Sequence, residues 1–268
     1  MNYLKQISYL IVSTILVGGA IGCQTDQNGA TATVGSLPPP SVKVTTEQRQ
    51  VPPEIAKEMI HSPIKEDPRA KALYKPGQWV SLFNGKDLTG WKVTDFAGHG
   101  EIEVEKAFKG QPALMLPMGE TLTGVTFTNP VPKTNFEVEM EIQKVDGNDF
   151  FCGLTFPVGE THASLIMGGW GGAVVGISSL DGSDASENDT TEYIKFDNGK
   201  WFKVRQRVTP TKLETWLDGD KLIDQEIEGR RVHMRFGEIE LSAPLGLATF
   251  QTTSAFRSIR IRRLPESK

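Results

Sequence analysis

Alternating hydrophobic and polar residues mark short segments throughout the C-terminal two-thirds of the chain. The clearest segment is "NFEVEMEIQKV", where apolar residues from Phe136 onward alternate with Glu137, Glu139 and Glu141. This period of two predicts a β-strand with one buried face and one polar face. The segment "KWFKVRQRV" at 200–208 repeats the pattern, with Arg205 on its polar face.

Further strand signals follow at short intervals. "KLETWLDGDKLIDQEI" predicts a hairpin that turns at Asp218 and Gly219, and "GLATF" and "FRSIRIRR" predict two closing strands. Glycine and proline are plentiful, with 27 and 16 residues, and few segments have helical periodicity. Many short strands without intervening helices predict an all-β domain, an antiparallel β-sandwich of the jelly-roll type, over residues 77–265.

The first 23 residues have a different pattern. Lys5 is the only charged residue before an apolar stretch from Ile7 to Val17, and small residues then precede Cys23. This arrangement is typical of a secretory signal peptide, and "AIGC" resembles the lipobox of bacterial lipoproteins, in which the cysteine is lipidated. We therefore expect export across the inner membrane and a lipid anchor at Cys23 in the cell envelope, in the periplasm or at the outer membrane. The alternative is an uncleaved membrane anchor, although the apolar stretch is shorter than the ~20 residues of a membrane span.

Residues 24–76 are rich in threonine, proline and glutamine and contain few large apolar residues. Such a composition predicts a disordered linker, compatible with one short helix at 53–60. The formal net charge of −4 and the absence of long basic runs argue against nucleic-acid binding. Once a signal peptide and Cys23 are set aside, Cys152 is the only other cysteine, so we expect a free buried thiol.

The segment "SLFNGKDLTGWK" at 81–92 resembles the opening strand and turn of the 3-keto-disaccharide hydrolase-like domain family. The similarity continues through "NFEVEMEIQ", "CGLTF" and "KWFKVRQRVTPTKLETWLDGDKLID" and ends at "FRSIRIRRL", so that it covers about residues 78–264. The block 150–196 is similar to a planctomycete-type lipoprotein variant of this family. The resemblance implies a concanavalin A-like (lectin/glucanase) sandwich. The motif itself indicates structure, because Asn84 and Asp87 favour a turn. Its large apolar residues are expected in the core: Trp79, Leu82, Phe83 and Trp91.

The resemblance also implies an activity on glycosides that are already oxidised at C3. A ketone at C3 acidifies the C2 hydrogen, so that a general base can remove it and the C1 substituent can leave by elimination. Water then adds to the unsaturated sugar. This chemistry needs a base, an acid for the leaving oxygen, and a donor or metal that stabilises the enolate. An ordinary glycosidase needs two facing carboxylates instead.

Three residues are candidate catalytic groups. His162 lies beside a glycine-rich block, Glu187 lies in the acidic loop "LDGSDASENDTTEY", and Arg205 lies on a strand face that could form the floor of a sugar cleft. Their structural alternatives are solvated loop residues for His162 and Glu187 and a solvated sheet face for Arg205. Gln251 and Thr252 in "FQTTSA" are candidate partners of sugar hydroxyls, although β-propensity also explains the threonine.

No cofactor is evident, and a divalent metal remains open. The acidic loop could supply oxygens to Ca²⁺ but lacks the regular spacing of a known calcium loop. A transition-metal site would have to combine histidines from distant strands, because no two of the four histidines are close in sequence.

Trp170 stands between two glycine pairs in "IMGGWGGAVVG". Glycines in a strand mark bulges or close approaches of a backbone or ligand, so two positions are open to this indole. It either fills space in the core, which is the interpretation we prefer from the sequence, or faces a ligand and stacks on a sugar ring. The family's polar strand, of the type Asn-Ser-Gly-Ile, corresponds here to the segment from Phe151 to Leu154, so two polar residues are replaced by phenylalanine and cysteine.

The sequence therefore predicts a secreted, carbohydrate-active lipoprotein, by resemblance a hydrolase or lyase of 3-keto-glycosides. The expected partners are an oxidised disaccharide or glycan and, through the lipid anchor, the membrane. A non-catalytic, lectin-like carbohydrate-binding lipoprotein and a structural envelope protein are the alternatives.

Overall fold

The computed structural model describes residues 64–265, so the predicted signal peptide, Cys23 and the helix at 53–60 lie outside the described residues. Strand β6 (Phe136–Gly147) contains the segment with the clearest alternation. Phe136, Val138, Met140 and Ile142 are all buried in the main hydrophobic core, as the period of two predicts. Strand β6 pairs antiparallel with β11 (Trp201–Val208) on one side and with β15 (Thr252–Arg263) on the other.

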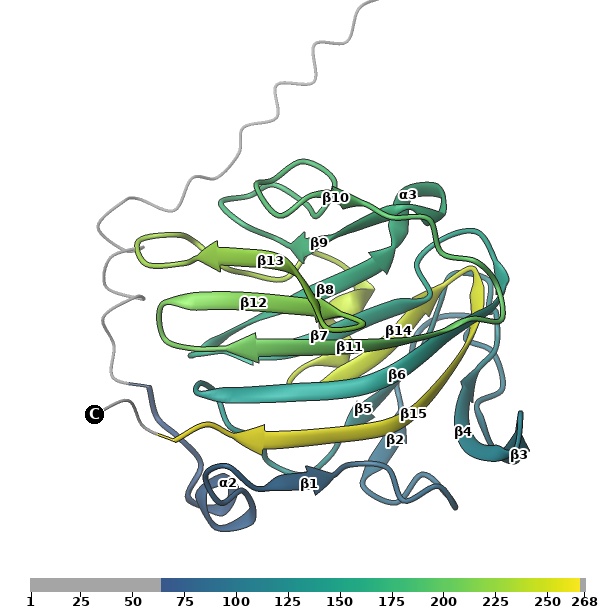
Figure 1. The fold of residues 1–268 in the computed structure, drawn as a ribbon, viewed down its shortest axis with the longest axis horizontal. Helices are drawn as coiled ribbons and strands as arrows, with labels where there is room; N and C mark the ends of the chain where they lie inside the picture. Colours follow the sequence, from purple (N-terminus) through teal and green to yellow (C-terminus); the bar gives the residue numbers. More distant parts are fainter. Residues whose placement is uncertain (1–63, 266–268) are drawn as a thin grey trace, which may run out of the picture. The chain divides into compact units, whose positions relative to one another are not determined.

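Two antiparallel sheets pack face to face, which confirms the predicted all-β sandwich (Figure 1). The eight-stranded sheet has the order β13-β12-β11-β6-β15-β4-β3, and β1 pairs with β15. Its remaining strands are β1 (Trp79–Ser81), β3 (Glu103–Phe108), β4 (Gln111–Leu116), β12 (Lys212–Leu217) and β13 (Asp220–Glu226).

The seven-stranded sheet has the order β10-β9-β8-β7-β14-β5-β2. Its strands are β2 (Trp91–Val93), β5 (Leu122–Phe127), β7 (Cys152–Val158), β8 (Thr161–Gly168), β9 (Val174–Ser178), β10 (Glu192–Tyr193) and β14 (Gly246–Phe250). The hydrophobic core between the sheets includes Leu154, Phe156 and Leu165 from this sheet. Cys152 is free and fully buried, as predicted, and this burial raises the pKa of its thiol.

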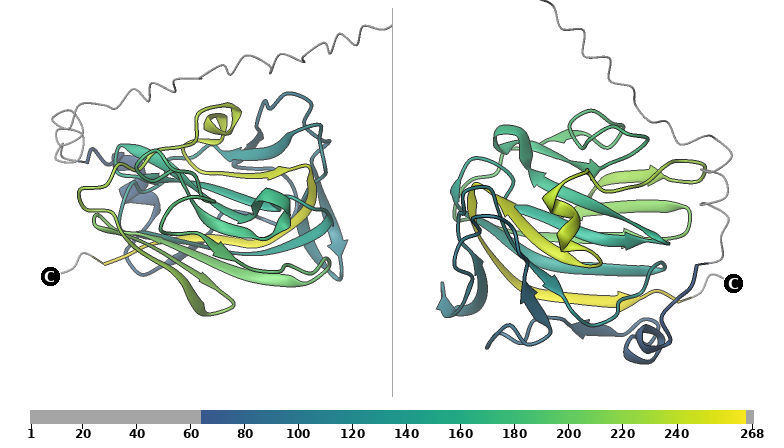
Figure 2. Two further views of the ribbon diagram at one scale, coloured as in Figure 1. Left: turned by 90° about the horizontal axis from the view of Figure 1, so that it is seen from above. Right: turned by 180° about the vertical axis from the view of Figure 1, so that it is seen from behind.

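A second, smaller apolar cluster lies on the outer face of the seven-stranded sheet, away from the main core. Phe96, Leu122 and Ala248 are buried there, and the half-buried Phe150 packs against them. The short 3₁₀ helix η1 (Glu238–Ser242) also lies over this face (Figure 2). Gly153 allows the Phe150 ring to lie close to β7, because a Cβ atom at position 153 would be only 3.1 Å from that ring.

Residues 64–76 correct the predicted boundary of the linker. Helix α2 (Pro68–Leu73) begins with Asp67 as its N-cap, whose carboxylate accepts a hydrogen bond from the Arg69 backbone N–H. Ala70 and Tyr74 are buried in the main core. This segment therefore belongs to the folded domain, although its composition resembles that of the linker before it. Within residues 64–265, no helix is long and apolar enough to cross a membrane.

The opening motif forms the predicted turn. The Asn84 side-chain oxygen accepts hydrogen bonds from the backbone N–H groups of Lys86 and Asp87. Hydrogen bonds from Thr89 and Asn84 lower the pKa of Asp87 to about 2. Leu82, Phe83 and Trp91 are buried as predicted. The prediction for Trp79 is wrong: it is half-buried, and the guanidinium groups of two arginines from β15 lie over its ring.

Candidate functional site

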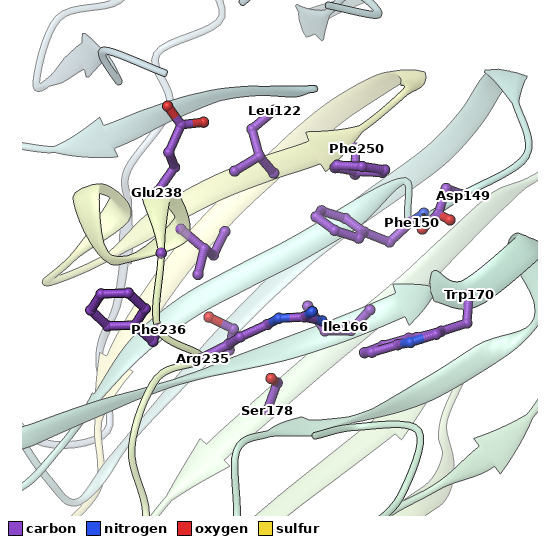
Figure 3. A pocket seen from close by; sticks show the side chains of 13 residues that line it. Leu122, Asp149, Phe150, Ile166, Trp170, Ser178, Arg235, Phe236, Glu238 and Phe250 are labelled. Atoms are coloured by element: carbon purple, nitrogen blue, oxygen red, sulfur yellow. Dashed lines mark hydrogen bonds between the residues drawn. The ribbon is translucent and has the colours of Figure 1, made fainter. Parts of the chain in front are cut away.

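A cavity of about 340 Å³ opens on the outer face of the seven-stranded sheet (Figure 3). Strands β5, β8, β9 and β14 contribute residues to it, together with the loop before β7, the turn α3 (Gly169–Gly172) and the segment 235–239. Its volume lies at the small end of the range for ligand pockets, about 300–1,000 Å³. The lining residues are Leu122, Asp149, Phe150, Ser164, Ile166, Trp170, Ser178, Arg235, Phe236, Gly237, Glu238, Ile239 and Phe250.

One side of the cavity is apolar and aromatic. The rings of Phe150 and Phe250 stack with their centroids 5.9 Å apart and their planes inclined by 29°. Phe236 is 92% exposed at the rim. Such a surface offers C–H and π contacts to the apolar face of a small ligand.

Trp170 lines this cavity and is 44% exposed, so the preferred interpretation of a buried Trp170 is wrong. The physical reason is the conformation of α3. Gly168, Trp170, Gly171 and Gly172 all have positive φ angles, of 77°, 48°, 88° and 101°. Glycine adopts this region without steric penalty, and the resulting left-handed turn directs the indole outward to the cavity.

Among the residues that the structure describes, Arg235 is the only Lys or Arg whose side chain lines the cavity. Its Nη1 lies 3.1 Å from Oδ2 of Asp184, and its guanidinium carbon lies 6.0 Å from the centre of the Trp170 ring. Asp184 in turn accepts hydrogen bonds from the hydroxyls of Ser178 and Ser179. The Arg235 side chain thus remains 59% exposed, and its guanidinium is held on one side by a carboxylate.

Two carboxylates lie at opposite ends of the lining (Figure 3). Oδ1 of Asp149 accepts a hydrogen bond from the Phe150 backbone N–H at 2.7 Å, and its Oδ2 accepts one from the Gly171 N–H at 3.3 Å. Oε1 of Glu238 accepts a hydrogen bond from the Ala97 backbone N–H at 3.3 Å. These contacts orient Asp149 beside Trp170 and hold Glu238 at the opposite end of the lining.

The three residues predicted to be catalytic lie apart from this cavity and from one another. His162 is half-buried near the start of β8, two residues from Ser164, and burial, assisted by the charge of Lys133, lowers its pKa. Glu187 is exposed in the acidic loop. The Arg205 guanidinium lies 4.0 Å from the centre of the Trp216 ring, on the outer face of the other sheet. Their catalytic roles stay predictions, and the structure does not bring them together.

Gln251 and Thr252 have different surroundings. Gln251 is exposed, and its side-chain amide donates to the Glu120 carbonyl at 3.3 Å, outside the cavity lining. Thr252 is fully buried, so its predicted contact with a ligand is wrong. Its hydroxyl exchanges hydrogen bonds with the backbone of Asp149, at 3.2 Å from the N–H and 3.1 Å to the carbonyl. Thr252 therefore positions a residue of the cavity.

Carboxylates of the acidic loop form ion pairs with arginine side chains of the same chain. Arg230 pairs with Asp181 at 2.6 Å and with Asp189 at 2.8 Å, and Arg235 pairs with Asp184. Over the described range 64–265, no group of three or more His, Cys, Asp or Glu side chains could hold a metal ion.

Sequence reasoning did not identify Asp149, Arg235 or Glu238. Asp149 follows a strand in an ordinary turn-forming segment, "DGND", and the other two lie in "HMRFGE", which has no periodic pattern. Neither segment carries a spacing that distinguishes a site from a solvated loop.

Comparisons with known proteins show which proteins this chain is similar to. A search of curated proteins finds no match to this chain. Among solved structures, the carbohydrate-binding module CBM66 from Bacillus subtilis is 13% identical to this chain. The match covers 65% of this chain and 95% of the CBM66 chain, with a TM-score of 0.43. Domain 4 of AbnA, a GH43 extracellular arabinanase from Geobacillus stearothermophilus in complex with arabinotriose, is 14% identical, with 72% and 95% coverage and a TM-score of 0.46. A protein with a galectin-like fold from Bacillus subtilis is 12% identical, with 71% and 98% coverage and a TM-score of 0.46.

The family match rests on the sequence. The model of the 3-keto-alpha-glucoside-1,2-lyase-like domain matches residues 78–262, most of the chain and nearly all of the sandwich. This confirms the resemblance inferred from "SLFNGKDLTGWK" and the strands that follow it. The chain belongs to the 3-keto-alpha-glucoside-1,2-lyase-like domain family, a family of carbohydrate-active domains.

Proposed function

We propose that the cavity beside Trp170 binds a 3-keto-α-glucoside and cleaves it by elimination across C1 and C2. The observation that carries the proposal is the juxtaposition of three chemically distinct groups around one small cavity: the exposed indole of Trp170, the Arg235 guanidinium and the Asp149 carboxylate. An indole face complements the C–H face of a pyranose, a guanidinium stabilises a developing oxyanion, and a carboxylate accepts a proton.

The roles follow from the chemistry of each group. Asp149 removes the C2 proton, and the electron pair of the C2–H bond forms the enolate of the C3 ketone. Arg235 donates hydrogen bonds to the enolate oxygen. The enolate then collapses back to the C3 ketone without a proton on its oxygen. As it does so, a C1–C2 double bond forms, the C1–O bond breaks and the C1 substituent leaves. The leaving oxygen takes a proton from solvent at the open side of the cavity, and later addition of water to the double bond completes a hydrolysis.

The test is turnover by the purified full-length chain of a 3-keto-α-glucoside and of its unoxidised parent, with and without EDTA. We expect cleavage of the keto-sugar alone, with an isotope effect when C2 carries deuterium. D149N should lower kcat by about 10²–10⁴-fold, the range for loss of a general base. The matched control is D197N, since Asp197 is an exposed aspartate whose ion-pair partner is Lys195, also exposed.

Each outcome bears on a different role or candidate function. Unchanged turnover in D149N would overturn the role of Asp149. Binding of glycosides without turnover would favour a lectin-like lipoprotein, and the absence of both would favour a structural envelope protein. Cleavage that EDTA abolishes would show that a metal takes part.

We also propose that the chain is exported and lipid-anchored at Cys23. The support is the sequence "AIGC" after an apolar stretch. Labelled palmitate should enter the protein produced in a bacterium with a lipoprotein pathway and should not enter C23S. Label retained in C23S would contradict the proposal.

A further inference from the structure

The hydrogen-bond directions below the cavity determine which groups a ligand must present to its floor. Ser164 on β8 and Ser178 on β9 line the cavity and are direct partners in the antiparallel register. Side chains in such a pair stand on the same face of a sheet, with Cβ atoms about 4.5–5.5 Å apart. The two hydroxyls are therefore neighbours on the floor.

The hydroxyl proton of Ser164 is used in a hydrogen bond to the hydroxyl oxygen of Thr155. Ser242 Oγ donates its proton to the Ile239 carbonyl at 2.5 Å. A serine or threonine hydroxyl has a single proton, so in the 2.7 Å contact between Thr155 and Ser242 the donor is Thr155. By the same argument Ser164 is the donor in its 2.9 Å contact with Thr155.

The hydroxyl proton of Ser178 is likewise used in a hydrogen bond within the protein, to Asp184. Its hydroxyl donates to Oδ1 of Asp184 at 3.0 Å, and the hydroxyl of Ser179 donates to the same oxygen at 2.9 Å. Asp184 is in turn paired with Arg235. Both Ser164 and Ser178 thus have only lone pairs left for a ligand.

We infer that Ser164 and Ser178 form an acceptor pair that selects a sugar ring carrying two free hydroxyl donors. A ketone oxygen cannot bind to this pair, because it has no proton to donate. The side-chain donors in the lining, the Arg235 guanidinium and the Trp170 indole N–H, are its partners instead. The acceptor pair and these donors together set the orientation of the ring. The placement of the ketone rests on the proposed function, whereas the acceptor pair does not.

The experiment uses methyl α-glucoside, which cannot undergo the elimination, and its analogues with fluorine in place of the hydroxyl at C2, C4 or C6. Fluorine keeps the size of the group but donates no hydrogen bond. Calorimetric titration of the full-length chain should show about tenfold weaker binding for the analogue whose fluorine meets a serine, since a polar group there stays unpaired. S164A or S178A should bring that penalty below about threefold, as expected for coupled partners.

S242A provides a sharper test, because Ser242 lies outside the cavity lining. Without Ser242, Thr155 can donate its proton to Ser164, and the Ser164 proton becomes free to point into the cavity. The fluorine penalty should therefore fall in S242A although Ser164 is still present. S258A, which removes a serine hydroxyl that pairs with Glu141 on the other sheet, should leave the penalty unchanged.

Fluorine tolerated at all three positions, or a penalty that is the same in wild type, S164A, S178A and S242A, would overturn the inference. A thermal unfolding scan of each variant separates loss of fold from loss of recognition. Serine-dependent fluorine penalties without cleavage of the keto-sugar would overturn the lyase proposal alone. Cleavage with serine-independent binding would overturn the acceptor pair alone, and no binding of either sugar would overturn both.

Discussion

At the scale of single residues, Trp170 is held in a backbone conformation that tryptophan rarely adopts. Its φ and ψ angles are 48° and 55°, in the left-handed region that costs an L-residue about 1–2 kcal/mol. Folding alone would favour glycine here, as at the neighbouring Gly171. An exposed aromatic residue that occupies a strained position beside a cavity points to a role in binding.

W170G is therefore expected to weaken glycoside binding about tenfold, through loss of the stacking surface, while the free energy of unfolding changes by less than about 1 kcal/mol. Relief of the backbone strain offsets the contacts that the indole loses. Titration calorimetry and urea denaturation measure the two effects. Y193A is the matched control, because Tyr193 is an exposed aromatic residue on β10 of the same sheet. Destabilisation of several kcal/mol with unchanged binding would mean that Trp170 is a structural residue.

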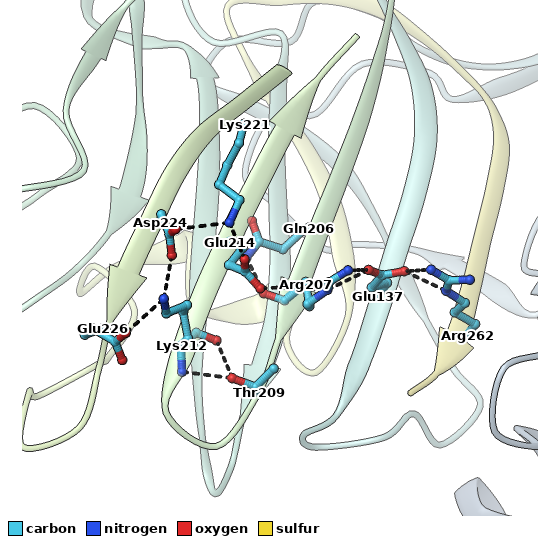
Figure 4. A network of polar contacts seen from close by, with 10 residues as sticks. All are labelled: Glu137, Gln206, Arg207, Thr209, Lys212, Glu214, Lys221, Asp224, Glu226 and Arg262. Carbon is cyan, nitrogen blue, oxygen red and sulfur yellow. Dashed lines mark hydrogen bonds and ion pairs between the residues drawn. The ribbon is translucent and has the colours of Figure 1, made fainter. Parts of the chain in front are cut away.

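At the scale of secondary-structure elements, β6 organises the outer face of the eight-stranded sheet. Glu137 is fully buried and accepts hydrogen bonds from Arg207 on β11 at 2.7 Å and from Arg262 on β15 at 2.6 Å (Figure 4). The ion pairs continue from Arg207 through Glu214 to Lys221. Charged side chains thus join the central strands β11, β6 and β15 through paired carboxylates and guanidinium groups.

E137Q should lower the free energy of unfolding by about 2–3 kcal/mol, because it removes the charge on which two partly buried arginines depend. Urea denaturation measures this loss. E103Q changes an exposed glutamate on the edge strand β3 and should shift the stability by less than about 0.5 kcal/mol. Equal effects of the two substitutions would contradict the importance of the buried network.

At the scale of the whole domain, the two outer faces of the sandwich differ in chemistry. One carries glutamates paired with arginines, and the other carries an aromatic cavity in which Arg235 is the one cationic side chain among the lining residues within 64–265. The paired carboxylates make stability depend on pH. The hydrogen bond from Arg257 is the main cause that lowers the pKa of Glu141 below 4.5, against the effect of desolvation, and hydrogen bonds lower that of Asp87 as well.

A carboxyl group with a lowered folded-state pKa stabilises the protein at pH values above its unfolded pKa. The contribution is lost as the pH falls through the folded-state pKa. The free energy of unfolding should therefore decrease as the pH falls from about 5 to 3, and the decrease should be smaller in E141Q. Urea denaturation at a series of pH values tests this. A steeper acid limb in E141Q than in wild type would contradict the assignment.

The sequence by itself determined the fold class, the family and the two faces of the central strands. Alternation along β6 and β11 is a local property that the pleat converts directly into a buried face and a polar face. The opening turn at Asn84 follows from local turn chemistry, and the free buried thiol of Cys152 follows from the cysteine count. The start of the domain was misjudged, because the burial of Ala70 and Tyr74 depends on contacts with distant strands.

Only the tertiary structure decided where the candidate site lies. Its residues come from loops and strands between Leu122 and Phe250, and no periodic pattern links them. The direction of the Trp170 side chain depends on a left-handed turn. The ion pairing of the buried Glu137 depends on arginines that lie 70 and 125 positions away in the chain. A residue's type and local spacing fix its strand and its face, whereas partners brought together by folding decide whether a charge is paired, a hydroxyl donates or accepts, and an indole meets solvent.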